Sequence, residues 1–521
     1  KLRERGILLN EVRTFALARK RIAEMASFAL QDIDIRIAGV QIARSEMRFQ
    51  LEGLIDDAML SSGIVEIVGE GGTGKSALLR AAADARSTLA RTIVLSPDRT
   101  PPGGWAALRA QYDIDVSAED FLLDLACDGG GVIFIDGLDK FRDQGERNTI
   151  MDLVIAASSV SGVCVVFTAR TGWADANAFN FSDTFTDTLG DRKTLTIETL
   201  NDQEAEALAE SCPALSELLK PDHPAKHLAR NPFILRRIAE ARLQAEAIIS
   251  EAALAANWWG TGGHGFSQSQ GQQRARKRTI IAKVEAQLSG LSLADVKKED
   301  HDAVSSLIED GVLVEIAADR VKFRHDIFTD WAVGMYLSEL SEHWGDLNLS
   351  AAPAYWLSRG VELCFRRLAE NPQSGWHDAM TSLVRDSAHE GWVALGLLAL
   401  ARSELAIELL QRHSDYLVDG DGVLAERLLR RVIAAHSQPA EKVLAELTPQ
   451  ATSVPVGLII PKGPVWIPVL VWTTRSFGRL PARALAAAVD VFEAWLILAA
   501  FGENTLSPAL IDRLTDLLVA D

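Results

Sequence analysis

The spacing of hydrophobic residues along the chain changes at about Gly63. Before this point, Glu11–Leu30 has apolar side chains at roughly helical spacing, which predicts a single helix. After it come five short, largely apolar runs that are separated by segments of helical pattern: Ile64–Val68, Thr92–Leu95, Val132–Ile135, Val163–Phe167 and Thr194–Ile197. Strands of a parallel sheet that is covered on both faces have this continuous apolar pattern. The pattern therefore predicts an α/β domain with a five-stranded parallel sheet.

Helical patterns replace the strands after the fifth run. A helix is expected to open at Asn201, and a later helix at Ala303–Glu309, a short hairpin and a helix from Asp326 predict helices packed on a small β-wing. From about Leu340 onward only helical patterns recur, which predicts an all-α superhelical array. Two helix pairs illustrate the recurrence: Val423–Ala435 with Ala440–Leu447, and Ala482–Ala499 with Pro508–Val519.

The first two predicted strands enclose a phosphate-loop motif. The sequence from Gly69 to Ser76, GEGGTGKS, fits the pattern GxxxxGK[ST] in full. Its glycines let the backbone turn N–H groups towards an anion, and the N-terminus of the following helix adds a favourable dipole. Lys75 is expected to meet the β- and γ-phosphates, and the Ser76 hydroxyl to ligate magnesium. We therefore predict that ATP (or ADP) with Mg²⁺ is bound by Gly69, Gly71, Gly72, Thr73, Gly74, Lys75, Ser76 and Ala77.

Polar residues that suit a phosphate-transfer site follow the third and fourth predicted strands. Asp136 comes directly after Val132–Ile135, and Asp139 lies three residues later. Asp136 is predicted to ligate Mg²⁺ together with Ser76, and Asp139 to polarise the attacking water. Arg170 follows the fourth strand and is predicted to sense the γ-phosphate, because a guanidinium matches phosphate oxygens. A solvated loop carboxylate at Asp139 and a surface arginine at Arg170 are the alternatives.

Composition narrows the range of partners. The chain has 53 basic and 71 acidic residues and a net charge of −18, which would repel a nucleic-acid backbone. Four cysteines lie far apart without metal-ligand spacing, which indicates reduced thiols in a cytoplasmic protein. Apolar stretches are too short or too often interrupted by charges to span a bilayer, so no membrane insertion is expected. Because the sequence begins at Lys1 and not at a methionine, we expect an effector domain outside it.

Between about Ile37 and Leu337, these residues resemble the STAND class of P-loop ATPases, the signalling switches that include the NACHT and NB-ARC proteins. The segment Asp136-Gly137-Leu138-Asp139 fits the acidic motif of that class, hhhhD[GAS]hDE, except that Lys140 stands where the last acid would be. This departure implies slow, regulatory hydrolysis. Thr168-Ala169-Arg170 resembles the sensor of the class, which follows its fourth strand.

Three further segments resemble parts of the class that enclose the nucleotide. Val40 and Arg44 lie in a segment that is similar to its adenine-contacting segment. Asn231-Pro232 resembles the helical-domain proline motif, which places Pro232 near the adenine. The segment 323–326 resembles the winged-helix histidine motif, in which His325 would hold the ADP-bound form. Judged by residue type alone, Pro232 could simply begin a helix and His325 could be a core histidine that caps one.

The resemblance also implies a domain order and a function. The expected domains are a helical linker (1–35), the P-loop NTPase domain (36–200), a helical lid (201–297), a winged-helix domain (298–340) and the start of a HEAT- or TPR-like sensor array (341–521). The implied function is an ATP/ADP-dependent switch that binds a protein ligand, such as a viral protein, on the array and then forms a homo-oligomer. Avs-like antiviral sensing in bacteria is the expected setting. A continuously cycling AAA+ ATPase and a DNA-binding transcription regulator of the same class are the alternatives.

Overall fold

A computed structural model of the chain describes residues 15–500, apart from several gaps. These gaps are 87–90, 98, 128–129, 142, 174–182, 191, 221–222, 224–225, 242–248, 263–290, 317–319, 340–343, 345–346, 372–374 and 441–457. The described residues form two compact units. Unit 1 comprises Lys1–Ala245, Ala286–Lys298 and Leu313–Lys322, and unit 2 comprises Glu246–Glu285, Glu299–Val312 and Phe323–Asp521. Each unit is described by itself, and the division into five domains stays a prediction.

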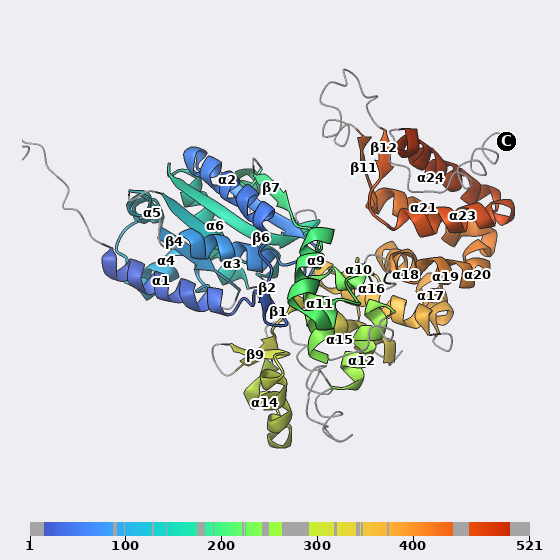
Figure 1. Cartoon of the computed structure of the whole chain (residues 1–521), viewed down its shortest axis with the longest axis horizontal. Helices are drawn as coiled ribbons and strands as arrows, with labels where there is room; N and C mark the ends of the chain where they lie inside the picture. The colour runs from blue at the N-terminus through green and yellow to red at the C-terminus, as the bar shows by residue number, and fades with distance from the viewer. Residues whose placement is uncertain are drawn as a thin grey trace, which may run out of the picture. The chain divides into compact units, whose positions relative to one another are not determined.

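Unit 1 is built on a five-stranded parallel sheet (Figure 1), as the apolar runs predict. Its strands, in sequence order, are β3 (Ile64–Gly69), β4 (Arg91–Leu95), β5 (Gly131–Ile135), β6 (Val163–Arg170) and β7 (Lys193–Thr196). Their order across the sheet is β4-β5-β6-β3-β7, and every neighbouring pair is parallel. All five predicted strands are therefore confirmed, and their carboxyl ends meet at one edge of the sheet.

Helices cover both faces of this sheet, which explains why its strands are apolar at successive positions. On one face, α1 (Ala16–Gln31), α2 (Ser45–Ser61) and α3 (Lys75–Arg86) bury their apolar sides against alternate strand residues such as Cys164 and Val166. On the other face lie α5 and α6, which contact β6 (Figure 1). The helices between α3 and the helical segment that begins at residue 202 are α4 (Gly104–Tyr112), α5 (Ala118–Ala126), α6 (Gln144–Ser158) and α8 (Asp183–Thr188).

The helical segment that follows the sheet in unit 1 consists of α9 (Asp202–Ser211), α10 (Lys226–Ala229) and α11 (Pro232–Ala241). The side chain of Asn201 accepts a hydrogen bond from the Glu204 amide, and the Glu204 carboxylate accepts one from the Asn201 amide. This reciprocal capping box explains why α9 begins where the sequence predicts. Unit 1 also contains the short hairpin strands β1 (Arg36–Ile37) and β2 (Val40–Gln41).

The predicted wing elements are present as secondary structure. A three-stranded sheet has the order β8-β10-β9, with β8 at Leu291–Ser292, β9 at Leu313–Ile316 and β10 at Arg320–Phe323. Helix α14 (His301–Glu309) precedes the hairpin and α15 (Asp326–Glu339) follows it. The boundary between the two compact units divides this segment, so a winged-helix domain stays a prediction.

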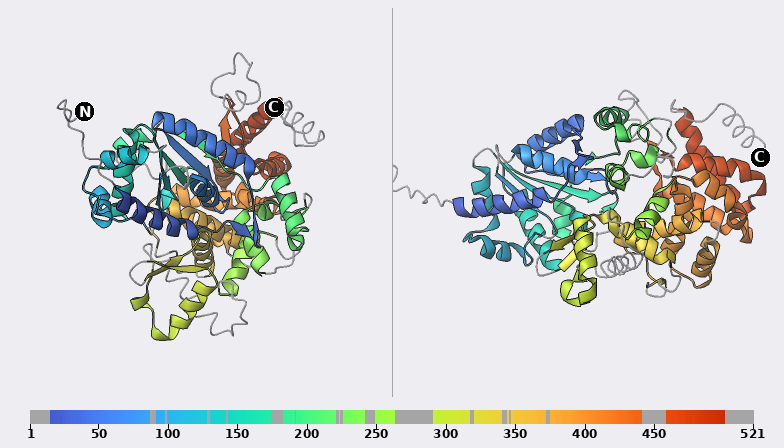
Figure 2. Two further views of the ribbon diagram at one scale, coloured as in Figure 1. Left: turned by 60° about the vertical axis from the view of Figure 1, so that its left-hand side comes forward. Right: turned by 60° about the horizontal axis from the view of Figure 1, so that its bottom comes forward.

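Unit 2 is mainly helical (Figure 2). A succession of contacts joins α15 to α16 (Tyr355–Glu370), α16 to α18 (Glu390–Arg402), α18 to α21 (Val423–Ala435) and α21 to α24 (Ala482–Ala500). Its other elements include α12 (Glu251–Gly260), α17 (Trp376–Arg385), α19 (Ala406–Arg412), α20 (Ser414–Val418), α23 (Trp466–Ser476) and a hairpin of β11 (Ser437–Pro439) and β12 (Ile459–Pro461). The predicted helices at 423–435 and 482–499 are confirmed. The second helix of each predicted pair falls on residues 441–447 and 508–519, which lie outside the described residues. The HEAT- or TPR-like array stays a prediction.

Candidate nucleotide-binding site

The phosphate loop lies between the end of β3 and the start of α3, as the motif predicts. Gly72 and Gly74 have positive φ values of 78° and 97°, which residues with a side chain rarely adopt. Gly69 is required for another reason, because a Cβ atom there would lie 2.4 Å from the Ile197 carbonyl oxygen. The glycines of the motif therefore let the loop turn between two packed strands and the N-terminus of α3, where backbone amides favour an anion.

Side chains of the motif itself hold the first carbonyl groups of this loop. Nζ of Lys75 donates hydrogen bonds to the carbonyl oxygens of Gly69 (2.8 Å) and Glu70 (2.7 Å). The Thr73 hydroxyl also donates to the Glu70 carbonyl, at 3.0 Å. The Lys75 ammonium is thus held against the loop, at the position from which a cation would meet bound phosphates.

Ser76 and Asp136 lie together at the carboxyl edge of the sheet. Oγ of Ser76, in the first turn of α3, donates to Oδ1 of Asp136 at 2.7 Å. The same carboxylate oxygen accepts a hydrogen bond of 2.8 Å from the hydroxyl of Thr168 on β6, which in turn accepts from the Gly137 amide at 2.7 Å. Asp136 is therefore held in one orientation by the neighbouring strand as well as by the loop.

The other two predicted phosphate-transfer residues lie at the same edge. Asp139 is half-buried in a 3₁₀ turn, Leu138–Lys140, directly after Asp136. Arg170 ends β6 and is paired in register with Gly69 of β3, so it lies beside the first glycine of the phosphate loop. The structure thus brings Asp139 and Arg170 to the edge that carries the loop, while their roles stay predictions.

The residues at this edge suit a magnesium–nucleotide complex. A serine hydroxyl and a carboxylate oxygen are hard oxygen ligands, and Mg²⁺ is usually held by one or two carboxylates together with phosphate oxygens and water. Ser76 and Asp136 are therefore the residues that would hold Mg²⁺, which would neutralise charge on the phosphates.

Arg44 also lies beside the phosphate loop. Its Nη1 is 4.0 Å from the place where a side chain on Gly74 would begin. Nη2 donates to the Glu198 carbonyl at 3.2 Å, and Nε lies 3.5 Å from the Glu204 carboxylate on α9. Burial lowers the pKa of the Arg44 guanidinium, and the Glu204 charge opposes this shift. Val40, predicted with Arg44 to contact the adenine, lies half-buried in β2.

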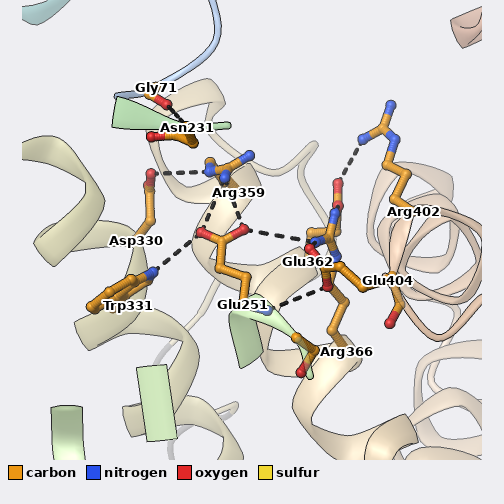
Figure 3. Close-up of polar contacts among 12 residues, drawn as sticks. Gly71, Asn231, Glu251, Asp330, Trp331, Arg359, Glu362, Arg366, Arg402 and Glu404 are labelled. Atoms are coloured by element: carbon orange, nitrogen blue, oxygen red, sulfur yellow. Dashed lines mark hydrogen bonds and ion pairs between the residues drawn. The ribbon is translucent and has the colours of Figure 1, made fainter. Parts of the chain in front are cut away.

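The helical segment that follows the sheet contacts the phosphate loop directly. Nδ2 of Asn231 donates a hydrogen bond of 2.9 Å to the Gly71 carbonyl (Figure 3). The Phe233 amide donates one of 3.2 Å to the Gly72 carbonyl. Pro232 is the first residue of α11, where its fixed φ suits a helix start. This position fits both interpretations of Pro232, so its predicted contact with the adenine stays a prediction.

His325 is exposed and lies in unit 2, between β10 and α15. Apart from Val40, the predicted site residues in unit 1 lie in or near the phosphate loop, whereas the predicted contact of His325 with the nucleotide would join the two units and stays a prediction.

Sequence reasoning missed the parts played by Thr168 and Asn231. Each belongs to a predicted motif, Thr168-Ala169-Arg170 or Asn231-Pro232. Within these motifs the sequence predicts a γ-phosphate contact only for Arg170 and an adenine contact only for Pro232. The signal for Thr168 is a hydroxyl residue directly after the apolar run Val163–Phe167. In the sheet, Phe167 pairs with Ile135, so Thr168 and Asp136 follow at the same level. The signal for Asn231 is a capping residue before proline, although nothing in the sequence names its partner on the loop.

No known family model matches this chain, and no curated relative does either. Solved structures that are similar to part of it include a Walker-type ATPase of Pyrococcus abyssi (13% identity, 57% of this chain and 97% of that chain, TM-score 0.29). Others are Cdc6p from Pyrobaculum aerophilum (12%, 57% and 94%, 0.28) and AMPPCP-bound DnaA from Aquifex aeolicus (15%, 51% and 89%, 0.29).

These likenesses are too distant to identify a function, so the sheet and the loop of the chain itself carry the conclusion. Within the described part of the chain, no helix combines the length and apolar character needed to cross a membrane.

The phosphate loop follows β3, the strand that lies between β6 and β7, and its serine contacts the acid at the end of β5. Unit 1 therefore contains an α/β domain with the fold and the phosphate loop of a P-loop NTPase.

Proposed function

We propose that this chain is an ATP/ADP-dependent signalling switch of the STAND type, with slow hydrolysis. The observation that carries the proposal is a contrast within one site. The residues predicted to bind phosphate and magnesium lie at one edge of the sheet, where Lys75 contacts the loop and Ser76 contacts Asp136. The acidic turn that follows has a lysine, Lys140, in place of the last acid of the STAND motif.

Lys140 lies across this turn. If Gly137 had a Cβ atom, that atom would be 2.6 Å from Cδ of Lys140, so the lysine stem packs directly over the glycine that follows Asp136. A cation in this turn lowers the negative charge available to activate a water molecule, whereas it leaves the phosphate loop unchanged. Tight binding with slow turnover is the behaviour of a switch and not of a motor.

The other parts of the proposal concern how the switch is used. ADP would hold the closed form, with His325 as a contact to the β-phosphate, and exchange for ATP would favour an open form that assembles into a homo-oligomer. The helices of unit 2 would bind a protein ligand, and bacterial antiviral defence is the setting we favour. The resemblance of residues 37–337 to the STAND class supports these points.

The turnover rate of the purified chain tests this proposal. We expect it to co-purify with ADP and to hydrolyse far less than one ATP per minute. Lys140→Glu, which restores the acid of the motif, should raise the rate, and Lys140→Met should raise it less because it only removes the cation. Multiple turnovers per minute by the wild-type chain would instead favour a cycling ATPase of the AAA+ kind. A salt-dependent affinity for DNA would favour the transcription regulator.

A further inference from the structure

Asn231 makes hydrogen bonds with two different elements of unit 1. Its Nδ2 donates to the Gly71 carbonyl of the phosphate loop at 2.9 Å (Figure 3). Its Oδ1 accepts from the amides of Phe233 (3.1 Å) and Ile234 (3.3 Å), in the first turn of α11. Only 8% of Asn231 is exposed. Because the donor and the acceptor of one planar amide both have protein partners, the side chain is held in a single orientation.

The carbonyl groups of the phosphate loop are held from two sides. Lys75 binds the carbonyls of Gly69 and Glu70, within the motif. The next two carbonyls, those of Gly71 and Gly72, are bound by Asn231 and by the Phe233 amide, both from the start of α11. Two of these four carbonyl groups are therefore bound from the start of α11.

Holding a carbonyl group also orients the amide of the next residue. A trans peptide is planar, and its C=O and N–H point in opposite directions. When Asn231 holds the Gly71 carbonyl, the N–H of Gly72 turns to the other side of the loop. A loop that binds phosphate needs its N–H groups on the side away from such protein donors. Asn231 therefore favours the loop conformation that binds an anion.

The residue before Asn231 carries this connection further into unit 1. Arg230 donates to the Asn201 carbonyl at 2.6 Å and to the Asp202 carboxylate at 2.7 Å, at the start of α9. The Arg230 carbonyl accepts from the Leu200 amide at 2.8 Å, directly before that helix. The dipeptide 230–231 thus joins the phosphate loop, α9 and α11 by hydrogen bonds.

From these contacts we infer that Asn231 is a positioning residue, which presets the phosphate loop for nucleotide binding and couples the occupied loop to helix α11. This inference rests on the proposed binding of ATP or ADP at the loop. It differs from the adenine contact expected of Pro232, because Asn231 acts on the backbone that receives the phosphates. By thermodynamic reciprocity, nucleotide that favours the held loop also stabilises the start of α11.

Affinity for ADP gives the first test, by calorimetry on the whole chain. In Asn231→Ser the side chain keeps a capping oxygen but is too short to reach the Gly71 carbonyl. Loss of this buried hydrogen bond should weaken ADP binding roughly 5- to 30-fold. Ser117→Ala removes a helix-capping hydrogen bond at the start of α5, which makes none of the contacts described above, and should change affinity less than about twofold. Lys75→Ala should abolish binding and serves to test the site itself.

Hydrogen exchange gives the second test, which a merely structural residue would not affect. In the wild-type chain, ADP should slow exchange of the Phe233 and Ile234 amides, and this protection should be lost in Asn231→Ser. The Asp120 amide, capped by Ser117 at the start of α5, serves as an unaffected control. Because the wild-type measurement needs no variant, it stands even if Asn231→Ser folds poorly.

The outcomes separate this inference from the proposed function. If wild-type chain binds ADP and Lys75→Ala does not, but Asn231→Ser binds as wild type does, the inference is wrong and the nucleotide site stands. Unchanged exchange at Phe233 on addition of ADP would also overturn the inference. If wild-type chain fails to bind ADP or ATP at all, the proposed function and this inference fall together.

Discussion

The hydroxyl of Ser76 donates a 2.7 Å hydrogen bond to the carboxylate of Asp136, although 60 positions separate the two residues in the sequence. The contact joins the first turn of α3 to the end of β5, which is not the neighbour of β3 in the sheet. Thr168, from the strand between them, binds the same carboxylate oxygen. The two oxygen groups that are predicted to ligate magnesium are thus positioned by three different elements.

Loss of the Asp136 carboxylate should therefore weaken only the magnesium-dependent part of nucleotide binding. We expect Asp136→Ala to reduce ATP affinity by about tenfold or more when Mg²⁺ is present, on the order of one lost charged contact, and to change it little in EDTA. Calorimetric titration of ATP under both conditions measures the difference. Equal losses with and without Mg²⁺ would show that Asp136 supports the fold of the loop and does not act through the metal.

Asp139 should affect hydrolysis and not binding. It lies three residues beyond Asp136, in the 3₁₀ turn, and its proposed role is to polarise water. Asp139→Asn should leave ATP affinity within about twofold and lower single-turnover hydrolysis on the order of 10²- to 10⁴-fold, as for a lost general base. If Asp139→Asn and Asp136→Ala gave the same profile of affinity and rate, the division of roles between the two acids would be wrong.

The parts of the fold that depend on local pattern could be predicted from the sequence. The strand bounds agree closely, because Val163–Phe167 and its counterparts are apolar on both faces and lie between helical segments. The phosphate loop and Asp136 could be placed because a strand end determines where the next residue lies. The side chains that hold Asp136 depend on which strands are neighbours in the sheet. The hydrogen bond from Thr168 to Asp136 could therefore not be predicted from the sequence.

Contacts between distant segments were harder to predict. Asn231 lies 160 positions from Gly71, and a capping asparagine before proline has the same local pattern whether or not it reaches another element. Glu362 and Arg366, one turn apart on α16, are residue types that are mostly exposed on helices. Only the packing of four helices reveals that both are buried and that they bind each other.

Glu362 belongs to a buried group of charges in unit 2 that also includes Glu251 and Arg366 (Figure 3). Its two carboxylate oxygens each lie 2.6 Å from a guanidinium, one of Arg366 and one of Arg402. Burial alone would raise the pKa of Glu362, but Arg402 and Arg366 outweigh it and hold the pKa at about 2. The fold therefore depends on this carboxylate being charged.

Neutralising Glu362 should destabilise unit 2. Glu362→Gln keeps the shape but removes a counter-charge from the buried guanidinium of Arg366 and from the partly exposed one of Arg402. Breaking a buried ion pair in this way should cost up to about 3–5 kcal/mol of unfolding free energy. Asp415→Asn breaks an ion pair with Arg479 in which Asp415 is 88% exposed, and should cost less than about 1 kcal/mol. Urea unfolding of both variants measures this contrast. A loss at Glu362 no larger than that at Asp415 would show that the buried charges contribute little to stability.

His436 should make the stability of unit 2 sensitive to mild acid. Its Nε2 accepts a 2.8 Å hydrogen bond from Nε of Arg402, which a protonated imidazole cannot do, and burial followed by the Arg402 charge lowers its pKa to about 4. The unfolded chain, with a histidine pKa of about 6.5, therefore binds more protons between these values. The contribution of His436 to stability is complete above pH 6.5 and is lost as the pH falls towards 4.

Burial raises the pKa of Glu404, which changes stability with pH in the opposite direction. The contribution of His436 must therefore be measured as a difference between the wild-type chain and a variant. His436→Gln keeps an acceptor for Arg402 and does not titrate, so from pH 7 to pH 5 it should lose less unfolding free energy than the wild-type chain does. Parallel stability curves for the two chains over this range would show that His436 does not remain neutral in the folded state.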